Sequence, residues 1–306
     1  MRVESRAPAK IILTGEHFVV FGARALAVSV DLWTKTVAEP ESSLVLRSEN
    51  PPSVCKGDEC SPNLRPLLAM LNEIITDNPR AVGYYHLYSD VPEARGMGSS
   101  AAAAVSLAAA ALELAKEEVS RDKIYKYSMI SEKIIHGNPS GVDPAASTYG
   151  GAILYSKLEG IRRFSVNNGE LAVCCSQSPR NTAAMLEVVA RFKKHKPILF
   201  DFLTQSSSNI TTEAATALES GNIALLAQLI KLSQEFLRII GVSNEELEHY
   251  ISSLESGGYA AKLTGAGGGG CVIGVPERLN LTLDCPAPIK MRIRYASNGV
   301  EAHTYE

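Results

Sequence analysis

Residues 92–112 read PEARGMGSSAAAAVSLAAAAL, with two glycines and two serines directly before an alanine-rich helix. Glycine lets a backbone approach a ligand closely, and the first turn of a helix presents unpaired N–H groups to an anion. The stretch therefore predicts a phosphate-binding loop that leads into a helix. A turn with an ordinary serine N-cap explains the same residues without a ligand, and the stretch alone leaves both interpretations open.

Two common phosphate loops do not fit the sequence. The Walker A pattern G-x-x-x-x-G-K-[ST] occurs nowhere in it, whereas Gly96, Gly98 and Ala101 do match the G-x-G-x-x-A pattern of dinucleotide-binding folds. Those folds expect another strand after the helix. Here residues 120–137 predict a second helix, with Ser120 as its N-cap and Gly137 as its end. The dinucleotide interpretation therefore fails, and a phosphate loop of another kind remains.

The composition is that of an ordinary globular protein. The chain has 306 residues, of which 45% are hydrophobic and 21% charged, and its net charge is -3. This length suits about two domains, and the acidic balance argues against a nucleic acid or an anionic membrane as partner. No apolar run reaches the length of a membrane span, and the start MRVESRAPAK lacks the apolar core of a signal peptide. We expect a cytoplasmic protein.

Six cysteines are spread over the chain, and no two form a C-x-x-C pair. Reduced or buried thiols are expected, and a zinc site is not. A disulfide between Cys55 and Cys60, in their Pro- and Ser-rich loop, remains as an alternative. The cysteines are Cys55, Cys60, Cys174, Cys175, Cys271 and Cys285.

Strand and helix signals follow one another irregularly along the chain. Apolar or alternating segments predict strands, and longer periodic segments predict helices. The predicted strands are 9–15, 25–40, 44–49, 83–91, 150–158, 162–166, 271–275 and 289–295. The predicted helices are 64–76, 99–116, 120–137, 180–195, 198–219, 222–240 and 243–256. This order predicts an α+β protein rather than a doubly wound parallel sheet, with a domain boundary near residue 168.

Three segments together resemble the GHMP kinase superfamily, which includes galacto-, homoserine, mevalonate and phosphomevalonate kinases. Residues 92–103, PEARGMGSSAAA, resemble its P-x-x-x-G-L-G-S-S-A ATP loop. Residues 7–31, APAKIILTGEHFVVFGARALAVSVD, resemble its first motif, and residues 262–275, KLTGAGGGGCVIGV, resemble its third. The resemblance implies the two-domain GHMP fold, with a ribosomal-protein-S5-like domain over residues 1–168 and a ferredoxin-like domain over residues 169–306.

Within the superfamily, two elements resemble the mevalonate kinases. Residues 132–151, EKIIHGNPSGVDPAASTYGG, contain the run H-G-N-P-S-G-V-D, and residues 15–20 are GEHFVV, where galactokinases have G-E-H-x-D-Y. The chain departs from the family's ATP loop at three positions. Gly, a small residue and Leu are usual where this sequence has Ala94, Arg95 and Met97.

The resemblance assigns metal and nucleotide roles to one group of residues. Ser100 and Glu132 match the family's Mg2+ ligands, and a hydroxyl with one carboxylate suits Mg2+, which keeps waters and phosphate oxygens as its other ligands. Without a metal, Ser100 reads as an N-cap and Glu132 as part of a solvated helix face. The ATP-binding residues that the resemblance implies are Pro92, Arg95, Gly96, Met97, Gly98, Ser99, Ser100, Ala101 and Ala102.

The catalytic roles fall on two residues. Asp143 matches the family's general base, and Lys10 matches a lysine that stabilises charge on the transferred group. An aspartate before a proline is also a good helix N-cap, with Pro144 at the first helical position. A lone lysine at the start of a strand is usually solvated, so the role of Lys10 depends on the resemblance.

The substrate-binding residues that the resemblance implies are Glu16, His17, Tyr149 and Gly267. His17 and Tyr149 can equally be buried residues of the core. Together these roles predict an ATP- and Mg2+-dependent kinase that phosphorylates the 5-hydroxyl of mevalonate, in isoprenoid precursor synthesis. Another kinase of the superfamily, acting on phosphomevalonate or a sugar, and a non-catalytic ligand-binding relative remain as alternatives. The resemblance also allows a homodimer, which the sequence does not decide.

Overall fold

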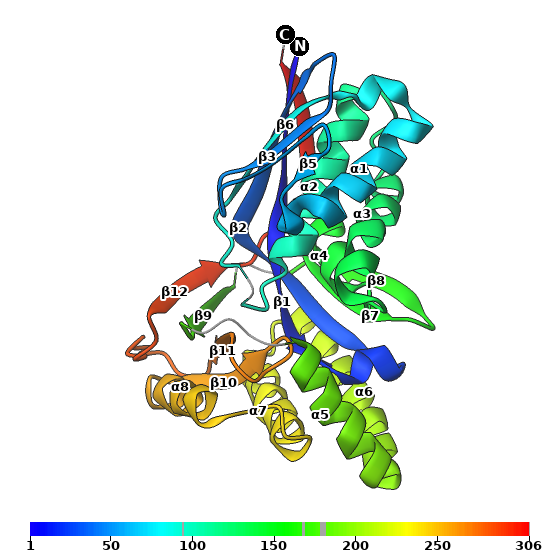
Figure 1. Ribbon diagram of the computed structural model, residues 1–306. Coiled ribbons are helices and arrows are strands. Elements are labelled where there is room, and N and C mark those ends of the chain that lie inside the picture. The colour runs from blue at the N-terminus through cyan, green and yellow to red at the C-terminus, as the bar shows by residue number, and fades with distance from the viewer. Residues whose placement is uncertain (94, 167–168, 178–181, 306) are drawn as a thin grey trace.

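The computed structural model describes residues 1–93, 95–166, 169–177 and 182–305. The chain forms two units, one above the other in Figure 1, and both termini lie at the far end of the upper unit. Both units combine sheet and helix, so the predicted α+β class is confirmed. The predicted domain boundary at residue 168 lies outside the described residues and stays a prediction. Within the described ranges, no helix is both long and apolar enough to cross a bilayer.

A large sheet forms one layer of the upper unit. Across it the strands are β13 (Glu301–Tyr305), β1 (Arg2–Thr14), β2 (Ala25–Pro40), β6 (Gly83–Ser89), β3 (Val45–Ser48), β4 (Ser53–Lys56) and β5 (Glu59–Cys60). Neighbours are antiparallel except β3 with β6. On the side away from β1, the long strand β2 pairs with β6 along its second half and with β7 (Ala152–Ser156) along its first. A hairpin to β8 (Gly160–Phe164) follows β7.

Helices cover one face of this sheet (Figure 1). They are α1 (Arg65–Asp77), α2 (Ser99–Leu114), α3 (Arg121–His136) and α4 (Val142–Tyr149). The central helix α2 packs on β1 and β2 and also contacts α1, α3 and α4. Its 12 buried residues lie all around the helix, and most of them are alanines. Small side chains let several elements approach the helix axis at once, which explains the alanine run as packing.

The lower unit is an antiparallel sheet with helices beneath it (Figure 1). Its strands, in order, are β10 (Tyr259–Thr264), β11 (Cys271–Pro276), β9 (Glu170–Cys175) and β12 (Ile289–Arg294). Its helices are α5 (Thr182–His195), α6 (Pro197–Ser220), α7 (Ile223–Ile239) and α8 (Glu245–Ser256).

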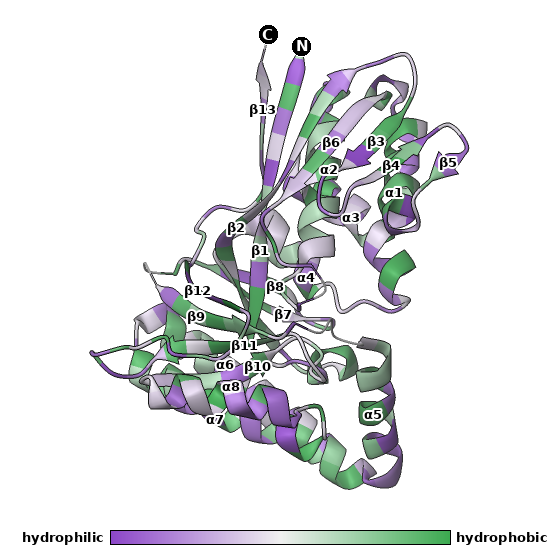
Figure 2. Cartoon of the chain, turned by 60° about the vertical axis from the view of Figure 1, so that its left-hand side comes forward, coloured by the Kyte–Doolittle hydropathy of each residue, from purple (hydrophilic) through white to green (hydrophobic). Residues whose placement is uncertain are grey.

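One hydrophobic cluster contains residues of both units. The second half of β1 runs down into the lower unit, where Ile11 and Leu13 pack in one cluster with Ile210 of α6 and Ile230 of α7. Figure 2 shows this lower part of β1 in the hydrophobic colour. Because β1 also carries the upper sheet, a shift of one unit against the other would disturb both cores.

Most predicted elements are confirmed, and the missed ones are short. The Ser120 side chain caps α3 by accepting from Lys123 N at 3.2 Å, and Gly137 ends the helix with a φ of 68°, as predicted. The short strands β4, β5, β10 and β13 are not among the predicted ones. The strand β13 pairs with β1, so the end of the chain returns to the upper sheet. A five-residue strand whose partner lies at the other end of the chain leaves little local signal.

The structure pairs all six cysteines as disulfides, so the expectation of reduced thiols is wrong. The pairs are Cys55–Cys60, which confirms the alternative that the sequence left open, Cys174–Cys285 and Cys175–Cys271. Two of these pairs join residues that lie directly opposite each other on neighbouring strands, β4 with β5 and β9 with β11. Strand register brings these thiols together, and cysteine spacing along the chain does not reveal register.

Candidate active site

The N-terminus of α2 faces a cavity of about 320 Å³. Its N-cap is Gly98, which has a φ of 75° and makes no side-chain capping hydrogen bond. Ser99 and Ser100 are the first helical residues, so the interpretation of either serine as an N-cap is wrong. Because no side chain caps the helix, the N–H groups of its first turn remain available to an anion, and the helix dipole favours negative charge there.

Lys10 lies directly beneath this loop and is 1% exposed. Its backbone N–H donates to the Met97 carbonyl at 3.0 Å, and its Nζ donates to the Gly96 carbonyl at 3.2 Å. A Cβ added at Gly98 would lie 2.8 Å from Lys10 Cγ, so a side chain does not fit there. Nζ also lies 3.0 Å from Asp143 Oδ1. The lysine is therefore buried and paired rather than solvated.

Asp143 belongs to the first turn of α4 and not to its cap. The N-cap of α4 is Gly141, with a φ of 92°, so the prediction that Asp143 caps a helix beginning at Pro144 is wrong. Glycine adopts this left-handed conformation readily, and the helix begins two residues earlier than predicted. The side chain of Asp143 is 22% exposed and pairs with Lys10. It lines both the cavity at α2 and a second, smaller one.

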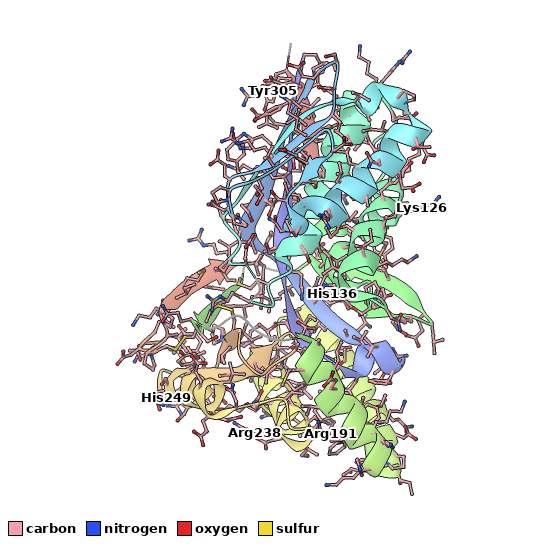
Figure 3. All side chains as sticks on the ribbon, viewed as in Figure 1. Lys126, His136, Arg191, Arg238, His249 and Tyr305 are labelled. Carbon is pink, nitrogen blue, oxygen red and sulfur yellow. A yellow bond between two sulfur atoms is a disulfide. The ribbon has the colours of Figure 1, made fainter. Side chains whose placement is uncertain are left out.

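Ser100 and Glu132 meet at the edge of the first cavity. The Ser100 hydroxyl donates to Glu132 Oε1 at 2.9 Å, and Glu132 is 2% exposed, so it does not belong to a solvated helix face. Its other oxygen lies 3.8 Å from His136 Nε2, one turn further along α3. Figure 3 shows His136 at the lower end of the upper helices, above α5. A hydroxyl and a carboxylate held together beside a phosphate loop are hard oxygen ligands of the kind that Mg2+ takes.

The second cavity has a volume of about 150 Å³ and contains Lys10, Asp143, Glu16 and His17 in its walls, with Ala266 from the loop after β10. His17 Nε2 donates to the Ala266 carbonyl at 2.9 Å. The backbone of His17 has a φ of 62°, which is uncommon for a residue other than glycine. Such a conformation persists where surrounding contacts hold it, and it is frequent at functional sites.

Glu16 is paired with Lys262, a residue that sequence reasoning did not single out. Its Oε1 accepts a hydrogen bond from Nζ of Lys262 on β10, and both side chains are fully or almost fully buried. Burial raises the pKa of the Glu16 carboxyl, and the charge of Lys262 opposes that rise. Burial lowers the pKa of Lys262, and Glu16 opposes that change. A single lysine in an apolar strand has no sequence signal that separates it from a solvated one.

Two predicted substrate residues lie apart from the others. Tyr149 ends α4, donates its hydroxyl to Asp122 Oδ1 at 2.6 Å, and lines a different cavity with Arg163 and Phe164. Gly267 lies behind the second cavity, where an added Cβ would be 2.2 Å from the Val242 carbonyl. Its neighbours Gly265 and Ala266 line the cavity instead.

The predicted ATP-loop residues divide into two groups. Those that line the first cavity are Arg95, Gly96, Gly98, Ser99 and Ser100. Arg95 also donates to the Gln177 carbonyl of the lower unit at 2.9 Å. Met97, Ala101 and Ala102 are completely buried and belong to the core, and Pro92 lines none of the cavities described here. The departure position Ala94 lies outside the described residues.

The far wall of the first cavity was missed by sequence reasoning. It consists of Asn50 after β3, of Asn63, Leu64 and Leu67 at the start of α1, and of Leu87 on β6. These residues come from three separate segments and form no motif. Polar amides and leucines around one space suit the base of a nucleotide whose phosphates lie at α2.

The chain matches known kinases over both units. Residues 67–151 match the family model of the GHMP kinases N terminal domain, and residues 214–280 match that of the GHMP kinases C terminal. The mevalonate kinase of Archaeoglobus fulgidus is 31% identical over 282 residues, which are 88% of this chain and 90% of that protein. This chain belongs to the mevalonate kinase family of GHMP kinases. The mevalonate kinase of Homo sapiens is 29% identical, over 87% of this chain and 84% of that protein.

Solved structures of mevalonate kinases have the same fold. The L. major mevalonate kinase in complex with R-mevalonate matches with a TM-score of 0.79 and 24% identity, over 97% of this chain and 96% of that one. The Methanococcus jannaschii mevalonate kinase matches with a TM-score of 0.77 and 24% identity, over 90% of each chain. The predicted two-domain GHMP architecture is confirmed.

Replacing Gly98 tests how closely the phosphate loop must approach Lys10. We expect Gly98→Ala to lower turnover roughly 100-fold, because a displaced lysine or loop misplaces the reacting groups. Gly160→Ala is the matched control, since Gly160 also has a positive φ, of 80°, but nothing lies within 4 Å of its added Cβ. Steady-state kinetics and thermal unfolding of both variants make the comparison. Equal losses of stability with unchanged turnover in both would contradict the close-approach argument.

Proposed function

We propose that the chain transfers the γ-phosphoryl group of ATP to the 5-hydroxyl of mevalonate. The observation that carries this proposal is the position of the Lys10–Asp143 pair between two cavities. Asp143 lines both cavities, and Lys10 lines the second while bonding to the loop of the first. A transfer between two bound molecules needs a group that reaches both, held in fixed geometry. We infer mevalonate as the phosphate acceptor because the relatives are mevalonate kinases.

The first cavity suits ATP. The uncapped N-terminus of α2 faces it, and Gly96, Gly98 and Ser99 form the loop against which phosphates can lie. The wall around Leu64 and Asn63 then receives the base. This orientation puts the terminal phosphate at the Lys10–Asp143 side of the cavity.

The second cavity suits a small molecule with hydroxyl groups. Asp143 is placed to accept the proton of the attacking hydroxyl while the bond from that oxygen to the γ-phosphorus forms and the bond to the β-phosphate oxygen breaks. The ammonium of Lys10 stabilises negative charge that develops on the transferred group. Glu16 and His17 lie in the same wall and are candidates for contacts to the rest of the substrate.

Ser100 and Glu132 are the residues that would hold Mg2+ here, since their oxygens already lie 2.9 Å apart beside the phosphate loop. The ion neutralises phosphate charge when ATP is bound.

A non-catalytic relative is the weaker alternative, because a pure ligand-binding protein does not need a buried lysine and a carboxylate between its two cavities. A cytoplasmic location and a homodimer stay predictions. The substrate is tested directly with a panel of mevalonate, phosphomevalonate, homoserine and galactose in a coupled ATPase assay. We expect mevalonate to give the highest kcat/KM, and a preference for any other member of the panel would contradict the assignment.

Asp143→Asn tests the proposed base. We expect turnover to fall about 10²- to 10⁴-fold, the usual effect of losing a general base, with a much smaller change in the KM for ATP. The double variant with Lys10→Met should recover stability, because no buried lysine is then left without its carboxylate, but should not recover turnover.

Asp122→Asn is the matched control, since Asp122 also lies in the first turn of a helix but outside both cavities. Near-normal turnover in Asp143→Asn would show that the base lies elsewhere.

Ser100→Ala and Glu132→Gln test the proposed Mg2+ ligands. Loss of a residue that only hydrogen-bonds to a metal ligand typically lowers metal affinity about 10- to 100-fold. Loss of a ligand itself should therefore raise the Mg2+ concentration for half-maximal activity at least roughly tenfold in each variant. The assay is a Mg2+ titration at fixed ATP. Ser252→Ala, at an exposed serine on α8, should behave as wild type. If neither variant changes the Mg2+ requirement, the two residues do not hold the metal.

A further inference from the structure

Lys262 is a buried cation that the proposed reaction does not use. It lies on β10 of the lower unit, and its side chain is 0% exposed. Its Nζ donates to Glu16 Oε1 and to the Leu263 carbonyl, the latter at 2.6 Å. An ammonium group removed from water is costly unless it is paired and hydrogen-bonded. A lysine kept at this position therefore needs a reason beyond packing, because an apolar residue would fill β10 at no such cost.

Lys262 acts at a distance from the substrate. It is not among the residues that line the second cavity, whereas Glu16 is. Any influence of Lys262 on a bound molecule must therefore pass through the Glu16 carboxylate. Lys10 also lowers the pKa of Glu16, although less than Lys262 does. Around the cavity, the ammonium groups of Lys10 and Lys262 face the carboxylates of Asp143 and Glu16, and Glu132 adds a third carboxylate to the wall.

The two oxygens of Glu16 differ in their surroundings. Oε1 is bound by Lys262, while Oε2 is buried and has no hydrogen-bond partner within the part of the chain that the structure describes. A buried carboxylate oxygen without a partner is costly, and native structures rarely retain one without a reason. Since Glu16 lines the second cavity, a hydroxyl group of a bound substrate can supply the missing donor.

The turn that holds Glu16 is fastened to the lower unit on both sides. Before it, the Thr264 hydroxyl donates to the Ile12 carbonyl at 3.2 Å. After it, His17 donates to the Ala266 carbonyl at 2.9 Å. Glu16 lies between these two contacts along the chain, and of the three bonds the one from Lys262 reaches the Glu16 side chain itself.

We propose that Lys262 is a positioning residue for the acceptor substrate, which holds Glu16 Oε1 so that Oε2 is presented to a substrate hydroxyl. The inference rests on the proposed function for the identity of that substrate. Lys262 thereby gives β10 a role in substrate binding, although no residue of β10 lines the second cavity. The nucleotide, which lies at the loop around Gly98, does not depend on this pair.

The test is a double-mutant cycle with Lys262→Met, Glu16→Gln and the variant that carries both changes. Lys262→Met should raise the KM for mevalonate roughly 10- to 100-fold, the range for a hydrogen bond to a charged group, and should leave the KM for ATP nearly unchanged. In the Glu16→Gln background, Lys262→Met should have no further effect on the KM for mevalonate, because the residue acts through Glu16. Lys231→Met, which breaks the exposed pair with Glu277 in the same unit, is the control.

A pH profile separates positioning from simple stabilisation. Without Lys262 the pKa of Glu16 rises further, so the carboxylate is lost at a higher pH than in wild type. The kcat/KM for mevalonate of Lys262→Met should therefore begin to fall at a higher pH than that of the wild type as pH is lowered. The other titratable groups around the cavity are unchanged in this variant: Lys10, His17, Glu132, His136 and Asp143.

Each result decides the matter. If Lys262→Met lowers the thermal midpoint but leaves the KM for mevalonate and its pH profile unchanged, Lys262 is only structural and the inference is wrong. If Lys262→Met does not fold, the double variant has no unpaired buried charge and is compared with Glu16→Gln alone. Equal KM values support the inference, and a further tenfold rise overturns it.

The substrate panel on wild type is measured first. A different preferred acceptor would refute the proposed function, and the same cycle would then be run with that acceptor.

Discussion

Lys10 reaches its partners because Gly98 has no side chain, and the packing of α2 on β1 brings the two together. The alanines of α2 let the helix lie close to the sheet, which places its uncapped N-terminus over a strand residue. At that distance the lysine stem fills the space that a Cβ would need, and its ammonium bonds to the Gly96 carbonyl and the Asp143 carboxylate. The phosphate loop, the cation and the proposed base are therefore fixed by one packing contact.

The two units divide the site between them. The upper unit supplies the loop and Ser100 on the proposed nucleotide side, and the Lys10–Asp143 pair between the two cavities. The lower unit reaches the proposed acceptor side through Lys262 on β10 and Ala266 in the loop after it, which hold the turn of Glu16 and His17. Since the second half of β1 is buried in both units, the two sides cannot shift independently without exposing apolar surface.

Buried charge is tolerated here because each ion has its partner close by. Lys10 and Lys262 would each be costly in an apolar interior, yet each faces a carboxylate. Pairing of this kind contributes little net stability compared with apolar residues of the same size. Its retention next to a cavity is better explained by geometry, because ionic hydrogen bonds hold carboxylate oxygens in defined directions.

The sequence by itself determined the fold class, and it predicted a phosphate loop directly before α2, where the structure has a cavity. These features depend on local patterns: glycines before a helix, a serine cap at Ser120, and a run of alanines whose small size indicates close packing. Only the tertiary structure decided that Gly141, and not Asp143, caps α4, that Tyr149 lies outside the cavity, and that the cysteines pair across strands. It alone revealed Lys262 and the wall around Asn63. The physical reason is the same in each case, because strand register and the approach of distant segments depend on packing over the whole chain, which no local pattern records.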